Sequence, residues 1–363
     1  MLNDFDGAPA KAAAHAVGHP GSCGILSDID MRQYLEAIIW GICAVLPFAC
    51  GTAAALTPIA LYQATAPLAD RSEGAQTAAF QSAMRTVLVR VTGNRMAEEE
   101  AALAPLVSNA RRYVQEYRPA GDGQLWVALD GPAIERWLTQ NGQPVWGRDR
   151  PATFVWLAAQ SGAQNGTLIT ADDVSELKAS IDAAAALRGL PLIWPSTADA
   201  QKNHVDYASV MGGSSAVLAD LARRSGGEGV LIGRANGDTA TAAVHWIFTF
   251  QDRTSDSSGP LEGIDRAADL YAGLFAASGS LQPVDIEVTG ISDLHEYASI
   301  EAYLESQSFI SRLSVQALRG DTVRFRLATR GGGESLQRSL ALGGRLTPLS
   351  GGENGLQRFE LHR

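Results

Sequence analysis

Cysteine is almost absent from this sequence, and its few copies lie near one end. The three cysteines of the 363 residues are Cys23, Cys43 and Cys50. Residues 51–363 therefore contain no disulfide, no thiol nucleophile and no thiolate metal ligand. Lysine is scarce as well, so nearly every basic side chain is an arginine.

The usual sequence signatures of enzymes are also missing. The chain has no Gly-x-Ser-x-Gly motif, no phosphate-binding P-loop, and no Gly-x-Gly-x-x-Gly loop after a predicted strand. No two histidines downstream of residue 55 are four residues apart, so no helical metal pair is visible. The acidic runs at 98–100 and 172–173 lie at predicted helix starts, where the helix dipole favours carboxylates. We predict no catalytic residue, no cofactor and no metal site.

A short apolar segment, Ala37–Ala49, follows Met31-Arg32 and precedes the small residues Thr52–Ala55. A basic start, an apolar core and an Ala-x-Ala site are the three parts of a secretory signal peptide. We therefore predict that residues 31–55 are a signal peptide cleaved after Ala55 and that the protein is periplasmic. Residues 1–30 are predicted to be a non-native or disordered extension upstream of the true start.

Three alternatives to simple cleavage were weighed for this segment. An uncleaved membrane anchor would need a longer apolar run, since a membrane-spanning helix takes about 20 residues. A buried core helix would not explain the small residues that follow. A lipoprotein signal would place a lipid on Cys50, but Pro47 and Phe48 fit that pattern poorly. We expect neither a lipid anchor at Cys50 nor a membrane span after cleavage.

Residues 56–147 combine a helix signal with a hairpin signal. Apolar residues recur every three or four positions from Phe80 to Val91, and Gly93 follows as a stop. The segments 112–118 and 124–130 flank a glycine-rich turn, which is typical of a hairpin. We predict an α+β domain over 56–147.

Two further domains are predicted downstream. Residues 150–280 begin with a continuous apolar strand at 152–159 and continue in a βαβαββ order, which predicts an α/β sandwich. Residues 281–363 follow a strand-helix-strand-strand-helix-strand order, which is the ferredoxin-like pattern. The predicted fold class is thus α/β and α+β, in three small mixed modules.

Positive charge is concentrated at the carboxyl end. Between Ile310 and Arg363 nine arginines face four carboxylates, a net charge of about +5 in a chain whose formal net charge is -10. Val323, Phe325 and Leu327 alternate as an inward face, so Arg324 and Arg326 should point outward together. Guanidinium groups bind carboxylate or phosphate bidentately. The candidate interaction surface comprises Arg319, Arg324, Arg326 and Arg330; the alternative is an ordinary solvated face.

Two tryptophans, Trp146 and Trp156, lie on either side of the boundary between the first and second predicted domains. Large aromatic rings dominate both cores and interfaces. We predict that the two rings form an interdomain aromatic cluster. Stacking on a sugar or a peptide is the alternative.

Four ordered motifs resemble a known family. They are the helix end Val87–Gly93, then Arg111–Tyr117, then Pro144-Val145-Trp146-Gly147-x-x-Arg150-Pro151, and then Arg188-Gly189-Leu190-Pro191. Behind a signal peptide, this set resembles a proteobacterial family of exported proteins described as a domain of unknown function. The second domain also resembles the α/β modules of the TolB amino-terminal domain and of penicillin-binding-protein activator lipoproteins. The resemblance implies a periplasmic location and carries over no functional residue.

These features favour a periplasmic accessory or adaptor protein of the cell envelope that acts by protein–protein interaction with an envelope partner. One alternative is a binder of an anionic envelope polymer, and another is an envelope hydrolase acting on glycan or peptide. Nucleic acid is not an expected partner, given export and the acidic body of the chain. The sequence leaves the partner and the oligomeric state open.

Overall fold

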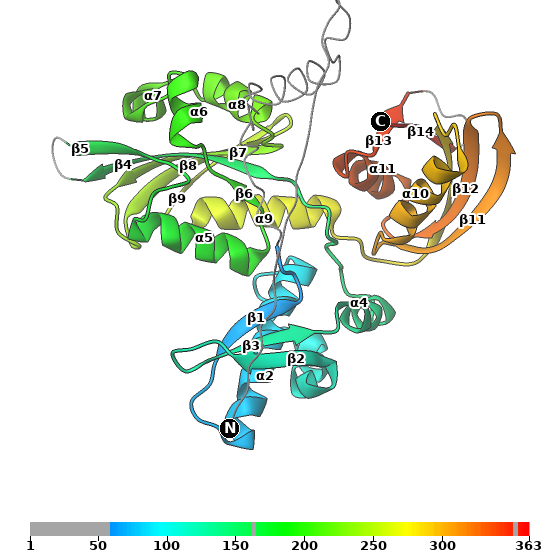
Figure 1. Cartoon of the computed structure of the whole chain (residues 1–363), viewed down its shortest axis with the longest axis horizontal. Coiled ribbons are helices and arrows are strands. Elements are labelled where there is room, and N and C mark those ends of the chain that lie inside the picture. The colour runs from blue at the N-terminus through cyan, green and yellow to red at the C-terminus, as the bar shows by residue number, and fades with distance from the viewer. Residues whose placement is uncertain (1–58, 162–164, 351–354, 363) are drawn as a thin grey trace, which may run out of the picture. The chain divides into compact units, whose positions relative to one another are not determined.

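The computed structural model describes residues 59–161, 165–350 and 355–362, and the segment from Ala53 to Arg363 forms one compact unit. Three separate sheets organise this unit into mixed α/β modules (Figure 1). The predicted fold class is therefore confirmed. The predicted extension 1–30, the signal peptide 31–55 and Cys50 lie outside the described residues.

The first module packs one long helix on a three-stranded antiparallel sheet. The strand order is β1 (Gln63–Pro67), β3 (Gln124–Leu129) and β2 (Val114–Pro119), and the helix is α2 (Glu73–Thr92). The predicted stripe from Phe80 to Val91 forms the buried face. Shorter helices complete the module: η1 (Ala101–Leu103), α3 (Ala104–Ser108), η2 (Ala110–Tyr113) and α4 (Gly131–Gln140).

The ends of α2 follow from local chemistry. Ser72 is the N-cap: its hydroxyl accepts a hydrogen bond from the Ala75 amide at 3.1 Å. Asp70 instead accepts from the Ser72 amide at 2.7 Å. Gly93 ends the helix as predicted, with φ of 72° in the left-handed region that glycine tolerates.

The second module is a sheet between two helix layers. The strands β4 (Thr153–Ser161), β7 (Gly229–Asn236) and β8 (Ala243–Phe250) form its centre, and β5 (Asn165–Ile169), β6 (Leu192–Ile193) and β9 (Arg253–Ser258) flank them. Helices α5 (Glu176–Arg188) and α9 (Glu262–Phe275) share one core with the sheet. On the other face lie α6 (Thr197–Lys202), α7 (Tyr207–Gly212) and α8 (Ser215–Arg224) (Figure 1).

The third module has a five-stranded sheet in the order β11-β12-β10-β14-β13. Its elements along the chain are β10 (Gln282–Thr289), α10 (Leu294–Glu305), β11 (Ile310–Arg319), β12 (Thr322–Thr329), α11 (Gly332–Leu342), β13 (Leu346–Leu349) and β14 (Gln357–Leu361). The first five follow the predicted ferredoxin-like order. The chain then adds a strand pair, and β14 enters between β10 and β13, parallel to β10.

One face of this third sheet is covered and the other is open. Ile286, Phe325 and Leu327 point into a core that includes residues of both α10 and α11. Their neighbours along β10 and β12 are half-buried or exposed, as the period of two in a strand requires. Arg324 and Arg326 of the candidate interaction surface lie on this open face, together with Asp285 and Glu287.

Candidate functional site

Two of the four candidate arginines lie side by side on the open face of the third sheet. Arg324 and Arg326 alternate with the buried residues of β12, as predicted. Each is opposite an acidic residue of β10: Arg324 faces Glu287, and Arg326 faces Asp285. Neither guanidinium is therefore free.

The hydrogen bonds of these pairs are short and directed. Arg326 donates from Nε and Nη2 to the two Asp285 oxygens at 2.7 and 2.8 Å. Arg324 donates from Nε and Nη2 to Glu287 Oε1 at 3.1 and 2.5 Å. The hydrogen bonds from Arg326 hold the pKa of Asp285 below its usual range, and Asp285 raises the pKa of Arg326 in return. The two pairs thus resist displacement by an outside anion.

The other two candidate arginines have no such partner. Arg319 ends β11, and the Arg330 amide donates to the Phe309 carbonyl at 3.1 Å, beside the start of that strand. Arg312, on β11 itself, was not selected from the sequence. Among the residues that the structure describes, none of these three guanidinium groups has a carboxylate within ion-pair distance. Apart from Arg345, which donates to Ser299 Oγ at 2.7 Å, the described arginines of this module that lack a carboxylate partner lie on β11 or beside its start.

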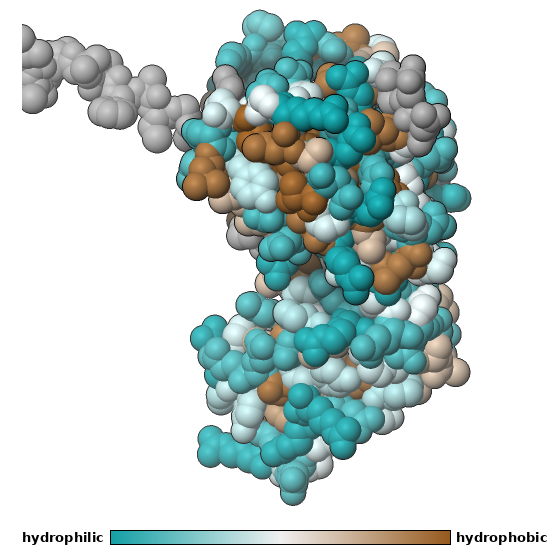
Figure 2. Space-filling view, turned by 90° about the vertical axis from the view of Figure 1, so that its right-hand side faces the viewer, coloured by the Kyte–Doolittle hydropathy of each residue, from teal (hydrophilic) through white to brown (hydrophobic). Residues whose placement is uncertain are grey.

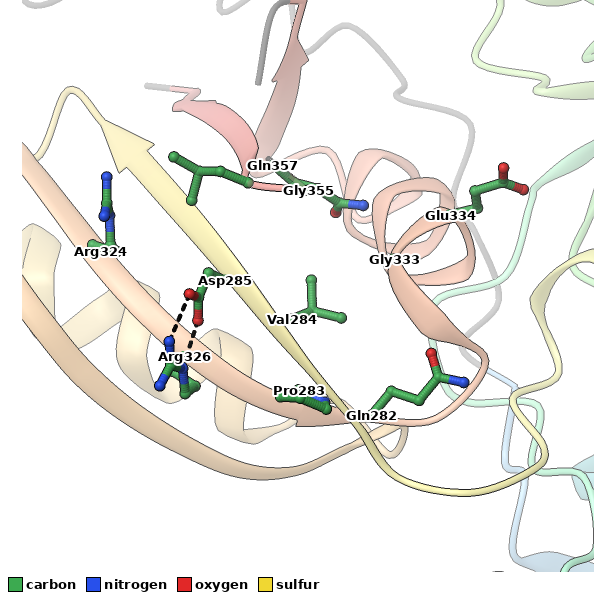
Figure 3. Close-up of a pocket in the computed structure, with 11 residues that line it drawn as sticks. Gln282, Pro283, Val284, Asp285, Arg324, Arg326, Gly333, Glu334, Gly355 and Gln357 are labelled. Atoms are coloured by element: carbon green, nitrogen blue, oxygen red, sulfur yellow. Dashed lines mark hydrogen bonds and ion pairs between the residues drawn. The ribbon is translucent and has the colours of Figure 1, made fainter. Parts of the chain in front are cut away.

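A pocket of about 970 Å³ opens in the same module, between β10 and the start of β14 (Figure 3). Pairing of β10 with β14 begins only at Ile286 and Gln357, so the segment from Gln282 to Asp285 pairs with no described strand on that side. Proline at position 283 suits such a segment, because it has no N–H to donate to a ladder. The pocket is thus a gap in the sheet.

The walls of this pocket are polar but balanced in charge. Arg324 and Arg326 line it together with Asp285 and Glu334, and the dashed lines in Figure 3 mark the Asp285–Arg326 pair. Gln282 and Gln357 add two amides, and the Gln357 Oε1 atom is buried without a hydrogen-bond partner in the described residues. This lining suits a neutral polar group, such as a peptide amide, better than a free anion.

Three of the four sequence motifs meet at a second place, a buried joint between the first and second modules. Arg150 is 8% exposed and lies 3.8 Å above the Trp146 ring. Burial lowers the pKa of Arg150, and five backbone carbonyls surround its guanidinium group. The acceptors are the carbonyls of Arg90, Trp146, Gly147, Arg188 and Gly189, at 2.7–3.4 Å.

Arg188 is the second cation of this joint and is 3% exposed. It donates to Asp265, to Asp269 at 2.5 Å and to the Gly93 carbonyl at 3.1 Å, which ties α5, α9 and the end of α2 together. Gly189 has φ of 66°, and a methyl group there would collide with the Arg150 guanidinium. The quoted motifs at 87–93, 144–151 and 188–191 are therefore parts of one structural joint.

A carboxyl with a raised pKa lies next to the joint. The carboxyl of Glu228 accepts from the Ala152 amide at 3.3 Å. Burial of the carboxyl raises the pKa of Glu228 to about 7, and the nearby Asp149 adds to the effect. Burial, followed by Asp149, also raises the pKa of Tyr303. Within the described part of the chain, Asp149 Oδ2 and the Tyr303 hydroxyl are enclosed without hydrogen-bond partners.

A family model described as a domain of unknown function (DUF8605) matches residues 55–147. Residues 55–147 form a DUF8605 domain. No match was found among curated proteins or among solved structures. The DUF8605 domain ends at Gly147, whose carbonyl accepts from Arg150, so its last residues belong to the joint.

The structure does not bring the two candidate tryptophans together. Trp146, at the end of the DUF8605 domain, packs in the core that α5 and α9 share with the sheet. Trp156 belongs to the core on the opposite face of that sheet, and its indole donates to the Leu218 carbonyl at 3.0 Å. Because β4 is buried on both faces, alternate residues of β4 point into different cores. Trp146 alone lies at the joint.

Some residues of these sites were missed from the sequence. Asp285 and Glu287 alternate out of phase with the apolar residues of β10, just as Arg324 and Arg326 do on β12. Opposite charges on two predicted strands of one sheet were a usable signal of pairing. Arg150 and Arg188 gave no signal, because burial of a charged side chain is not visible in a pattern of residue types.

Proposed function

We propose that this protein is an exported adaptor of the cell envelope that binds another protein through its third module. The observation that carries the proposal is the uncovered surface of that module: an open sheet face, a gap in the sheet and an edge strand with free arginines. By contrast, the cations at the joint of the first two modules are buried and donate to internal carbonyls and carboxylates. The first two modules are therefore better suited to carry a binding module than to bind.

Export is part of this proposal, and the start of the family match is compatible with it. The DUF8605 match begins at residue 55, next to the site where cleavage is predicted. None of the helices in the described ranges is long and apolar enough to cross a membrane. We propose, as part of the same account, a proteobacterial periplasmic origin and a second module of the TolB amino-terminal type. A sheet with helices on both faces is compatible with that type.

Two observations favour other functions. The free arginines along β11 would also suit an anionic envelope polymer. Glu228, whose pKa is raised to about 7 beside Asp149, is the kind of carboxyl that a hydrolase of glycan or peptide uses as a general acid. Both remain alternatives: Arg324 and Arg326 are already paired with carboxylates, and Glu228 does not line the pocket of Figure 3.

Site-specific photo-crosslinking in intact cells tests the adaptor proposal. A photoreactive amino acid would replace Leu318 or Glu334 in the third module, or Asp256 and Arg136 in the other modules as exposed controls. We expect discrete protein adducts from the third module and few from the controls. No adduct at any position would contradict the proposal, and so would adducts from the control positions alone.

Two further measurements address the premises. The intact mass of protein isolated from the envelope should correspond to a chain that begins near Leu56; a start at residue 1, or a lipid on Cys50, would contradict the predicted export. A panel of glycan and peptide substrates should show no turnover. Turnover that disappears in a Glu228→Gln variant would favour the hydrolase instead.

A further inference from the structure

We propose that β11 is a docking edge, to which an extended acidic segment of another protein adds as a further strand of the third sheet. The inference rests on the proposed function and deepens it, because it names the surface and the chemistry of the partner. In this mode of binding, main-chain hydrogen bonds provide affinity and alternate side chains provide specificity.

The backbone of β11 is open along one whole side. It is the terminal strand of the sheet order and runs for 10 residues, from Ile310 to Arg319. Most of its residues are exposed, and among the described strands it pairs with β12 alone. In Figure 1, β11 lies outermost in the third module, and the space-filling view of that side shows apolar patches among hydrophilic side chains (Figure 2). An uncovered edge of this length is a template for strand addition.

Charge selects an acidic partner. Arg312 and Arg319 lie on β11, Arg330 lies beside its start, and β11 itself contains no carboxylate. These three arginines have no ion pair in the described residues, whereas Arg324 and Arg326 on the next strand are neutralised by Glu287 and Asp285. Arg345 aside, which donates to Ser299 Oγ, the unpaired positive charge of the described part of this module therefore lies at the edge that an incoming strand would meet. Such complementarity speeds association and rejects basic partners.

The two faces of β11 differ, which sets the pattern of the partner. Val315 and Leu318 pair with the inward residues Phe325 and Val323, yet remain 42% and 65% exposed. Arg312 and Arg319 pair with residues of the open face, Ala328 and Thr322. Because side chains alternate along a strand, the matching segment should alternate acidic and apolar residues.

A second copy of this chain fits the edge less well than an acidic strand. In the antiparallel register that places Val315 opposite Gln316 of the other copy, Arg312 would face Arg319 of that copy, and like charges directly opposite destabilise a sheet. A parallel pairing would place each arginine beside its own counterpart. Bulges near Ser311 and Gln316 also hinder self-pairing, but they leave regular runs at 312–315 and 317–319. The same features admit an acidic strand.

Peptide binding to the full exported chain tests the inference. The probe is a labelled peptide of about ten residues that alternates Glu with Val or Thr; the comparison peptide has Lys in place of Glu. We expect the acidic peptide to bind and to slow amide hydrogen exchange within β11. An R312S/R319S variant should bind it about fivefold or more weakly, since each exposed ion pair contributes a few tenths to one kcal/mol. An R136S/R253S variant, which removes the same charge from exposed sites in the other modules, should bind normally.

Several outcomes would overturn the inference. The first is equal affinity for the acidic and the Lys-containing peptide. The second is equal affinity of the R312S/R319S and R136S/R253S variants for the acidic peptide. The third is slower amide hydrogen exchange only outside β11 when the acidic peptide is bound. A concentration-dependent dimer that protects β11 would make a second copy the occupant, and binding of polyphosphate without protection of β11 would indicate a polymer site. Crosslinks from position 334 without slower amide hydrogen exchange in β11 would contradict the docking edge but would leave the adaptor proposal standing. If no position in the third module yields crosslinks, the adaptor proposal itself fails.

Discussion

The arginines of the joint and the arginines of the third sheet differ in what surrounds them. Arg150 and Arg188 are almost wholly buried; the Arg150 guanidinium is surrounded by backbone carbonyls and the Trp146 ring, and the two Nη atoms of Arg188 donate to carboxylates and a carbonyl. Arg312 and Arg319 project from an edge strand with no internal acceptor described for either. Arginine thus stabilises the packing of the first two modules at the joint, whereas on β11 it is available to bind a partner. The environment, and not the residue type, decides between these roles.

Removing the central cation of the joint should have the largest effect. An Arg150→Ala change leaves five buried carbonyls without their donor, and we expect the free energy of unfolding to fall by about 3–5 kcal/mol. An Arg150→Lys change should recover little, because an ammonium group cannot reproduce the planar fork. Urea denaturation of the exported chain measures both.

The exposed neighbour Arg148 is the matched control for that prediction. An Arg148→Ala change should shift the stability by no more than about 0.5 kcal/mol. A loss of similar size in the Arg148 and Arg150 variants would show that the comparison between buried and free arginines is wrong.

Arg188→Ala should have the next largest effect, about 2–3 kcal/mol. Its removal leaves Asp265, Asp269 and the Gly93 carbonyl without their shared donor, although both carboxylates can regain some water. Asp269→Asn should cost less, about 1 kcal/mol, since Asp269 is already 46% exposed. Thermal unfolding of the two variants shows which one loses more stability. A larger loss in Asp269→Asn than in Arg188→Ala would contradict the assignment of Arg188 as the organising residue.

Glu228 should make stability depend on pH near neutrality. Its carboxyl keeps its proton up to about pH 7 when folded, but loses it near pH 4.3 when unfolded. Between these values the unfolded chain binds fewer protons, so the free energy of unfolding should fall as the pH rises from about 4.3 to 7. A Glu228→Gln variant should be more stable at pH 8 by about 1 kcal/mol, after allowance for partial exposure.

The measurement is a series of urea midpoints between pH 5 and pH 8. Wild type should lose stability across this range, and the Glu228→Gln variant should vary less. Parallel curves for the two proteins would mean that the Glu228 carboxyl titrates as an ordinary surface acid.

The smallest effect should separate the paired from the free arginines of the third module. An R324S/R326S variant leaves Asp285 without its cation and Glu287 with only the longer contact to Arg358, at 3.8 Å, so its unfolding midpoint should fall slightly at low salt and recover at high salt. An R312S/R319S variant should keep its midpoint at any salt concentration. Identical salt profiles for the two variants would remove the distinction between the open face and the edge.

Much of the fold was predictable because it depends on short-range patterns. The stripe on α2, the stop at Gly93 and the alternation on β12 each report on a single element and its buried face. Strands β5 and β9 were missed because their sequences, NGTLI and RTSDSS, lack a long apolar alternation. They are extended because they pair with β4 and β8, which the local sequence does not reveal.

The sites were less predictable because they join distant segments. The pairs of Arg324 and Arg326 with β10 depend on register across about 40 residues, and the joint gathers carbonyls from three motifs. Trp146 and Trp156 are close in sequence, yet they point into opposite cores. Proximity along the chain was therefore a poor guide to contact, whereas matched alternation on two strands would have been a good one.

The most direct test of the central claim is complementation of a deletion strain by the R312S/R319S variant, with R136S/R253S as the charge-matched control. The claim is that the free arginines of the third module, and not the buried ones, carry the interaction. Both variants should reach wild-type levels in the envelope and unfold at the wild-type midpoint. The account predicts that R312S/R319S fails to complement while the control complements fully. Full complementation by R312S/R319S would contradict it.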